Sequence, residues 1–516
     1  MTRRHPAKGF TTAGRDGAMI WLLRAEWTKF RTVRGWVAGM LGAAVVFVAL
    51  GVLTAASSHT TCGAGAVEVA CPVPPLGPEG GAVDDTFLFA HRALTGDGAI
   101  TARLTGMTGV ITYPPPDHDE IVPGLVPWAK AGVIVKADTR PGSSYAALML
   151  TGKHGVHLQH DFTHDTAGRP GGVSAASPRW LRLVRAGGTI TGYESTDGTR
   201  WTKVGTVRPA RLPGTVRVGL FVASPGDLTV KPGGVSQVRF TQTTGVFDNV
   251  TTQGAAGAWR HEEVGGDEAM TDWERYHRPA GVREAAGTLT VTGSGDIAPK
   301  TDGRRIEQTL AGLLPALMLV IVVATLFTTT EYRRGLIRAT LLTTPSRTRT
   351  LAAKTAVLAA VTFTCALAAT AVTMPLATRV LHAGGNILLP VPALTELRVT
   401  LGMATAFALA ATLVAALGTL YRRAAPTVTT AFALLVLPYI LSVVLPDTPA
   451  RLLLTLTPAA AFAVQQTAPE YPQVTAYYAP SGGYFPLPPW AGLTVLVAWT
   501  AAALVTAALL LDRRDA

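Results

Sequence analysis

Gln308 to Thr330 reads QTLAGLLPALMLVIVVATLFTTT and is followed at once by Glu331-Tyr332-Arg333-Arg334. No charged residue interrupts this run, and about 20 helical residues are needed to cross a hydrocarbon core about 30 Å thick. Because lipid offers the backbone no hydrogen-bond partners, such a run predicts a transmembrane helix. The arginines that follow it predict that this end faces the cytoplasm.

Five further apolar runs predict the remaining spans. They are Trp36 to Ala56, Ala352 to Ala377, Val399 to Leu420, Thr427 to Leu445 and Trp490 to Leu511. The segment Tyr421 to Pro426, with two arginines and a proline, predicts a tight hairpin between the fourth and fifth spans. Only 15% of the 516 residues are charged, which is few for a soluble protein. We expect a polytopic α-helical membrane domain of six transmembrane helices, with outer loops at 378–398 and 446–489.

The positive charge is distributed by membrane side. The formal net charge is +12, and the lysines and arginines of the membrane part gather in 1–35, in 331–351 with Lys354, at Arg422 and Arg423, and at Arg513 and Arg514. The two alternate short loops carry only Arg379, Arg398 and Arg451. The positive-inside rule then predicts a plasma-membrane protein with both termini in the cytoplasm and 57–307 outside. Since topology accounts for the charge, we expect no nucleic-acid partner.

The segment 57–82 is predicted to link the first span, 36–56, to a folded outer domain. It is rich in glycine, proline and alanine and poor in large apolar residues, as linkers are. Cys62 and Cys71 lie in it, on the side of the membrane where disulfides form, so we predict that they pair. Two thiols alone make no metal site.

Residues 83–245 carry the period-two pattern of β-strands. The clearest run is Trp180-Leu181-Arg182-Leu183-Val184-Arg185, which is followed by Gly187 and Gly188 and then by a second alternating run from Thr189 to Glu194. Glycine supplies the positive φ that hairpin turns require. We expect an all-β sandwich or jelly roll inserted between the first and second helices, with 246–307 as a second small β-rich lobe, which is either a lobe of the same sandwich or a truncated second module.

Four motifs resemble the strands of concanavalin-like, laminin-G-like sandwich domains. They are Asp84-Asp85-Thr86-Phe87, Trp128-Ala129-Lys130-Ala131-Gly132-Val133, Arg179-Trp180-Leu181-Arg182-Leu183, and Tyr193 to Trp201, which reads YESTDGTRW. The resemblance covers about Asp84 to Phe240 and implies a fold, but no function, because such folds host lectins, enzymes and spacers.

Several residues of this domain could bind a ligand. Trp128, Trp180 and Trp201 could stack on sugar rings, but each begins a strand within an apolar pattern, so core packing is the expected role. His154, His157, His160 and His164 could suggest a metal. Because a strand alternates faces, His157 should point away from the others, and we expect no metal site. The acid pairs Asp84/Asp85 and Glu262/Glu263 also face opposite ways, which disfavours glycoside hydrolysis.

The membrane part resembles the permeases of type-2 ATP-binding-cassette transporters. The resemblance rests on the loop from Glu331 to Arg347, EYRRGLIRATLLTTPSR, and on the lead-in Leu23 to Thr32, LRAEWTKFRT. It implies that the loop 331–351 is a coupling helix that docks on a cytosolic ATPase. The implied coupling residues are Glu331, Arg333, Arg334, Gly335, Arg338, Thr340, Pro345 and Arg347. The alternative is that these arginines only anchor the spans to anionic headgroups.

The lead-in is predicted to form an interfacial helix through Arg24, Glu26, Trp27 and Lys29. No phosphate-binding loop is encoded, because the nearest string, Thr151-Gly152-Lys153-His154-Gly155, lacks both the first glycine and the hydroxyl after the lysine. This chain should therefore bind no cofactor, with ATP and Mg²⁺ held by a partner ATPase subunit.

Our first hypothesis is an exporter permease, not itself an enzyme, that pairs with a second permease copy or a paralogue. The nearly uncharged spans favour an apolar or amphiphilic cargo. The outer domain would bind a surface or exported ligand such as a glycan. The alternative is a membrane-anchored carbohydrate-binding sensor without transport, and a membrane-bound glycosidase is a distant third. A sensor leaves five of the six spans unexplained.

Overall fold

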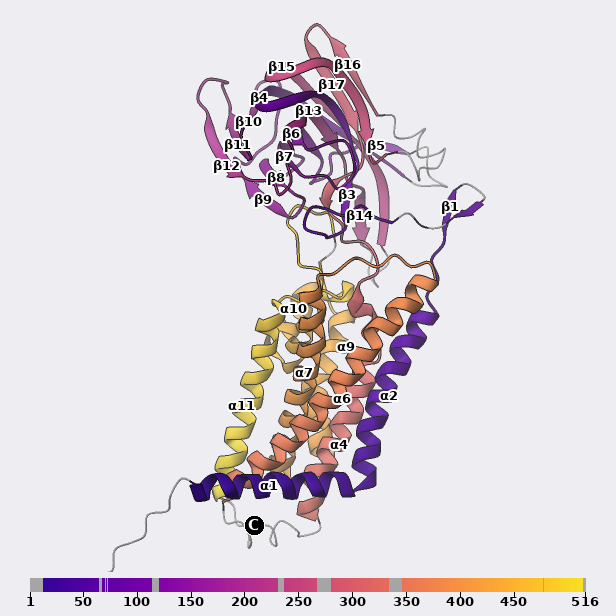
Figure 1. Ribbon diagram of the computed structural model, residues 1–516, viewed down its shortest axis with the longest axis vertical. Helices are drawn as coiled ribbons and strands as arrows, with labels where there is room; N and C mark the ends of the chain where they lie inside the picture. The colour runs from indigo at the N-terminus through magenta and orange to yellow at the C-terminus, as the bar shows by residue number, and fades with distance from the viewer. Residues whose placement is uncertain are drawn as a thin grey trace, which may run out of the picture.

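The molecule is a bundle of helices that carries a β domain at one end, while α1 lies across the other end (Figure 1). The computed structural model describes residues 13–64, 67–69, 71, 73–113, 120–230, 236–266, 280–333, 346–476 and 478–513. Six helical segments in these ranges are long and apolar enough to cross a membrane. The sequence-based prediction of six apolar helices and a large β domain is therefore confirmed.

The helices follow the predicted order. Their bounds are α1 Ala13–Thr32, α2 Arg34–Ala56, α4 Leu313–Arg333, α6 Arg347–Ala383, α7 Ala393–Tyr421, α8 Ala424–Leu435, α9 Leu437–Val444, α10 Asp447–Leu456 and α11 Pro489–Arg513, with 3₁₀ turns η1 Ile306–Leu310, η2 Pro458–Gln465 and η3 Pro480–Gly482.

Several spans differ from their predicted bounds. The third and fourth are longer than predicted, as α6 Arg347–Ala383 and α7 Ala393–Tyr421. The second begins at Leu313 instead of Gln308, because Gln308 belongs to η1. The fifth is divided at Val436 into α8 and α9. Pro438 lies just after this break, and its ring and missing N–H disfavour a continuous helix.

The outer loop 446–489 folds back onto the bundle. Every residue of η2 is buried, and a Cβ on Gly492 of α11 would lie 2.1 Å from the Ala460 carbonyl oxygen. Arg398 and Arg451 each donate to a carbonyl of this loop, at Gln466 and Tyr478. These two arginines are exceptions to the charge pattern, and they have a structural role because each satisfies a backbone acceptor.

The β domain contains eighteen strands in the described ranges. They are β1 Cys62–Ala64, β2 Val67–Val69, β3 Val83–Asp85, β4 Phe87–Thr112, β5 Ile121–Pro123, β6 Lys130–Lys136, β7 Tyr145–Thr151, β8 Val156–His160, β9 His164–Ala167, β10 Arg179–Ala186, β11 Thr189–Ser195, β12 Thr202–Val207, β13 Thr215–Ala223, β14 Asp227–Val230, β15 Ser236–Val264, β16 Gly281–Ala285, β17 Thr288–Gly293 and β18 Ile297–Pro299. Every ladder between them is antiparallel, and one sheet holds fourteen of these strands.

The long strand β4 organises this sheet. Its first half pairs with β13 and its second half with β10. Two leaves diverge from it, β13-β6-β7-β8-β9 and β10-β11-β12. Leu148 and Leu158 of the first leaf and Leu181 and Leu183 of the second belong to one core cluster. Alternate residues of β10 therefore face inward, as the period-two pattern predicted.

The predicted boundary between the sandwich and 246–307 does not divide the sheet, which agrees with the alternative that 246–307 belongs to the same sandwich. Position 245/246 falls inside β15, which pairs with β4 from Phe240 to Val264 across several bulges, and β16 and β17 extend the same sheet. Gly245, the last residue of the predicted sandwich, lies inside a strand where a Cβ would meet the Phe247 ring at 2.9 Å. The glycine is needed for close packing.

The β domain is joined to the bundle through paired strands. β3 follows the linker from α2, β18 leads toward α4, and the two strands pair with each other. Buried lysines of β6 hold them: Lys136 binds Asp85 at 2.6 Å and Lys130 binds Asp296. From the outer loop, Gln473 donates to the Phe162 carbonyl at 3.1 Å. Near the linker, Cys62 and Cys71 are joined in a disulfide, with Cα atoms 5.0 Å apart.

Candidate coupling site at the α1 end of the bundle

Helix α1 has one face against the bundle and one face turned away. Leu22, Glu26 and Phe30 are buried, and their spacing of four places them on one side of a helix. Trp21 and Trp27 are 69% and 47% exposed on the other side. A helix with aromatic residues on its outer side can lie along a membrane surface.

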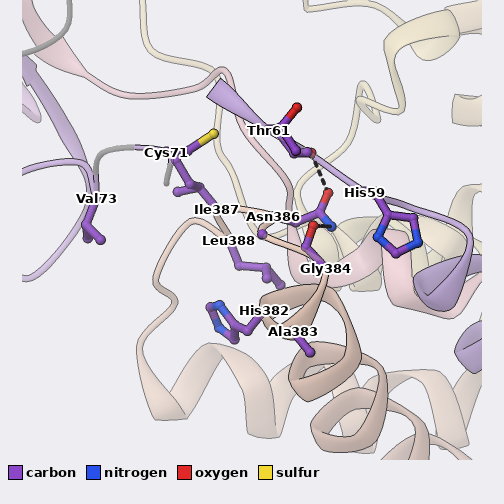
Figure 2. Close-up of a pocket in the computed structure, with 12 residues that line it drawn as sticks. His59, Thr61, Cys71, Val73, His382, Ala383, Gly384, Asn386, Ile387 and Leu388 are labelled. Atoms are coloured by element: carbon purple, nitrogen blue, oxygen red, sulfur yellow. Dashed lines mark hydrogen bonds between the residues drawn. The ribbon is translucent and has the colours of Figure 1, made fainter. Parts of the chain in front are cut away.

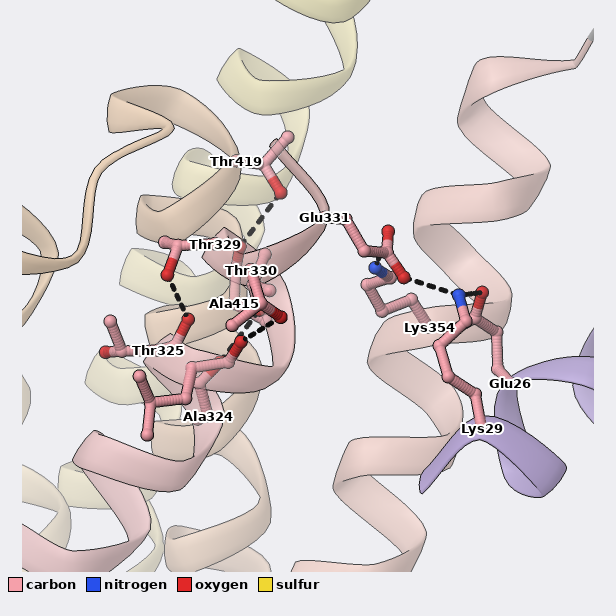
Figure 3. A network of polar contacts seen from close by, with 12 residues as sticks. Glu26, Lys29, Ala324, Thr325, Thr329, Thr330, Glu331, Lys354, Ala415 and Thr419 are labelled. Atoms are coloured by element: carbon pink, nitrogen blue, oxygen red, sulfur yellow. Dashed lines mark hydrogen bonds and ion pairs between the residues drawn. The ribbon is translucent and has the colours of Figure 1, made fainter. Parts of the chain in front are cut away.

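A cluster of four charged side chains, three of them buried and Lys29 32% exposed, joins α1 to α4 and α6 (Figure 3). Lys29 donates to Glu26 at 2.8 Å and also to Glu331, which lies in the last turn of α4. Glu331 accepts a further hydrogen bond from Lys354 in the second turn of α6. Glu331 and Lys354 are only 3% and 5% exposed. Glu331 thus bridges two lysines that come from different helices.

Aromatic rings close this cluster on one side. Trp36 of α2 packs edge-on against Phe327 of α4, with ring centroids 5.0 Å apart, and Phe30 packs against both rings. The Lys354 ammonium lies 5.3 Å from the Phe327 ring centroid. The apolar surroundings lower the local dielectric, which strengthens each ion pair but makes any unpaired charge costly.

The four charges balance, because two carboxylates face two ammonium groups. Burial on its own would lower the pKa of Lys29, but Glu331 and Glu26 outweigh it and raise that pKa. Lys29 therefore stays charged. Movement of α1 relative to α4 and α6 would break charged contacts in a site with little water, so these three helices should move together.

Other contacts join the remaining helix ends at this side of the bundle. Arg347, the first residue of α6, donates to the Leu511 carbonyl of α11 at 2.5 Å. The Arg422 guanidinium, just after α7, lies 5.4 Å from the Tyr332 ring centroid of α4. These contacts tie α4, α6, α7 and α11 together at this end of the bundle.

The predicted coupling residues are thus divided between described and undescribed parts of the chain. Glu331 and Arg347 take part in the contacts above, and Arg333 is the last residue of α4. Arg334, Gly335, Arg338, Thr340 and Pro345 lie outside the described residues. Of the predicted interfacial residues, Glu26 and Lys29 join the cluster, while Arg24 is exposed and lies over the Trp21 ring at 5.4 Å. Sequence reasoning missed Lys354 as a site residue, although it is the one charge inside the third apolar run.

The three tryptophans of the β domain separate into two groups. Trp128 is 7% exposed and stacks on His154 with centroids 4.2 Å apart, so its expected packing role is confirmed. Trp180 and Trp201 are half-buried on the outer side of β10. There Arg103 lies 5.6 Å from the Trp180 ring and Arg182 lies 5.9 Å from the Trp201 ring. Core packing was the wrong expectation for these two, because Trp180 alternates with the inward Leu181.

The histidines pair locally. His157 binds Asp165 at 2.7 Å, and its ring contacts Trp128, as the ring of His154 also does. The expectation that His157 points away from the other histidines is therefore wrong for His154, but it holds for His160 and His164, which lie on the other face of the strand pair. His160 stacks on His164, which binds Glu79 at 2.8 Å. Within the described ranges, no group of three or more histidine, cysteine or acidic residues could hold a metal ion.

The acid pairs are used in ion pairs. Asp85 binds Lys136, its neighbour Asp84 binds Lys300 at 2.8 Å, and Glu262 binds His91. Asp84, Asp85 and Glu262 thus have basic partners already.

Comparisons with known proteins assign no family. No family model matches the chain, and no curated protein matches it. Among solved structures, a functionally unknown protein from Saccharomyces cerevisiae matches with 14% identity over 32% of this chain and 74% of its own, at a TM-score of 0.20. The GH43 BlXynB protein from Bacillus licheniformis matches with 14% identity over 31% of this chain and 27% of its own, at a TM-score of 0.20. Scytalido-glutamic peptidase matches with 6% identity over 41% of this chain and 98% of its own, at a TM-score of 0.26. Similarity this low carries no argument about function.

Proposed function

We propose that this chain is the permease subunit of an ATP-binding-cassette exporter, driven by a separate cytosolic ATPase. The observation that carries the proposal is the cluster of Glu26, Lys29, Glu331 and Lys354. It joins α1 to the ends of α4 and α6, and these two helices flank the segment 334–345 that resembles a coupling helix. Force applied to that segment by a docked ATPase would reach both helices and α1 as one unit.

The orientation in the membrane follows from charge. Arginines and lysines concentrate at the α1 end of the bundle, so we assign that end to the cytoplasm and the β domain to the outside. The β domain lies at the opposite end of the bundle from α1 (Figure 1). In this orientation the ATPase and the β domain act on opposite membrane faces.

A second candidate function is surface binding by the β domain without transport. It is favoured by the half-buried Trp180 and Trp201 beside arginines on an outer sheet face, an arrangement able to contact a glycan. This hypothesis does not explain the charge cluster at the α1 end of the bundle.

The test is co-purification of the tagged full-length chain with its ATPase from cells that express both. We expect the wild type to retain the ATPase, and Arg334→Glu or Gly335→Pro to lose it. The matched control is Arg140→Glu in the β domain, where Arg140 is 86% exposed, and it should retain the ATPase. If the wild type retains no ATPase but binds glycans, the transport proposal falls and surface binding replaces it.

A further inference from the structure

An open pocket of about 650 Å³ lies where α2 and α6 end beneath the β domain. It is lined by His59, Thr61, Cys71, Val73, His382 and Leu388, among others (Figure 2). Its volume falls in the range of small-molecule sites, about 300 to 1,000 Å³. Because α2 and α6 are candidate spans that end here, the pocket lies at the boundary between membrane and water.

Asn386 fixes the shape of this pocket. It is 3% exposed, and its Oδ1 accepts hydrogen bonds from Ser58 at 3.0 Å and Thr60 at 2.8 Å. Its Nδ2 donates to the carbonyls of Ser58 at 2.7 Å and Leu381 at 3.1 Å. One buried amide therefore locks the end of α2 to the end of α6. The pocket is built in advance of any ligand, which reduces the ordering cost of binding.

The polar side of the pocket is basic. His59 and His382 are exposed on it, and among the described residues that line it none carries a carboxylate. Arg379 is exposed one turn before His382 on the same helix, and residues three apart are neighbours on a helix surface. Within the described part of the chain, Arg379 makes no hydrogen bond or ion pair, whereas the two other outer-loop arginines serve the fold.

An apolar stripe leads away from these bases toward the membrane. Val372 and Leu376 of α6 are 51% and 40% exposed, and with Arg379 they lie at positions i, i+4 and i+7 on one helix face. The face thus changes from apolar to basic at the membrane boundary. This order is complementary to an amphiphile, whose apolar chains are followed by an anionic headgroup.

We propose that this pocket binds an outer-leaflet lipid with an anionic phosphate headgroup. The phosphate contacts Arg379, His59 and His382, and the acyl chains lie along Val372 and Leu376. The outer-leaflet location rests on the orientation assigned under Proposed function, but the site itself uses neither an ATPase nor the charge cluster at the α1 end.

The test is lipid binding by the full-length chain in detergent, measured by native mass spectrometry with phosphatidylglycerol or phosphatidylcholine as the probe. The test variant is Arg379→Ala with His382→Ala. The matched control is Arg140→Ala with Arg200→Ala, which removes exposed basic groups from the β domain. We expect the test variant to bind phosphatidylglycerol at least about tenfold more weakly than the control, the loss expected for one charge-assisted hydrogen bond. Size-exclusion profiles should match, because Arg379 and His382 are exposed.

Three results would overturn the proposal. Equal binding by the test variant and the control would remove Arg379 and His382 from the site. Equal binding of the two lipids by the wild type would remove the preference for an anionic headgroup. Displacement of phosphatidylglycerol by inorganic phosphate alone at millimolar concentration would show that the acyl chains contribute nothing and that a free phosphate is the ligand.

Discussion

Replacing Lys354 with methionine should test the charge cluster most sharply. Methionine keeps most of the length of the side chain and removes only the charge. The side chains of Lys354 and Glu331 are 6% and 4% exposed, so solvent screens their interaction weakly. Removing one partner of a buried ion pair costs about 3 to 5 kcal/mol. Because Lys29 still faces Glu331, we expect the lower end of that range, about 3 kcal/mol.

The assay is a double-mutant cycle of Lys354→Met and Glu331→Gln, with unfolding of the full chain followed in mixed detergent micelles. The sum of the two single-variant unfolding costs should exceed the cost of the double variant by about 1 to 3 kcal/mol, since the double variant leaves neither charge of this pair unpaired. Arg349→Met on the same helix is the control, and it should cost less than about 0.5 kcal/mol. Additive costs, or a Lys354→Met cost no larger than the control, would refute the account of the cluster.

Three further predictions concern other parts of the molecule. Gly492→Ala should destabilise the bundle by about 1 to 3 kcal/mol, because its Cβ would overlap a carbonyl of η2. The control Gly42→Ala, with open space at its Cβ, should leave stability unchanged. Thermal unfolding of both variants tests this difference. Gln473→Leu should raise the rate of amide hydrogen exchange in the outer loop 446–489, since it removes the buried hydrogen bond to the β domain. An unchanged exchange rate would show that this hydrogen bond does not stabilise the loop. Burial lowers the pKa of His91 and of His160 below the ordinary value, so the unfolded chain takes up protons first and stability should fall as pH drops through about 6.5. A melting temperature that is constant or higher at pH 5.5 than at pH 7.5 would contradict this.

The membrane part was predictable because its signals are local. An uncharged run of sufficient length has few alternatives to a transmembrane helix, so the runs around Phe327 and Phe407 could be assigned without tertiary information. Helix ends were less predictable. Gln308 belongs to the 3₁₀ turn η1, which lies between β18 and α4 where the chain passes from the β domain into the bundle. A local sequence pattern does not reveal this turn.

The coupling site was only half predictable, because its contacts are long-range. Glu331 was named through the resemblance to permease coupling loops and Lys29 through the predicted interfacial helix, but their ion pair joins residues 302 positions apart. Lys354 was assigned to the general positive charge of the cytoplasmic side. Its pairing with Glu331 depends on how α4 and α6 pack, which the sequence alone does not specify.

The β domain shows the same division between local and long-range information. Period two placed Leu181 and Leu183 inward correctly. It could not reveal that Gly245 lies within a strand, since a glycine in a turn and a glycine at a close contact have the same local sequence signal.

The central claim is that a cytosolic ATPase docks on the segment between α4 and α6. The most direct measurement is photo-crosslinking in cells from a photo-reactive residue in place of Leu336, with position 140 of the β domain as the control. The account predicts an adduct from position 336 alone, in which mass spectrometry identifies an ATP-binding-cassette ATPase by its phosphate-binding loop. Adducts from position 336 with lipid only, while the ATPase is present and expressed, would contradict it.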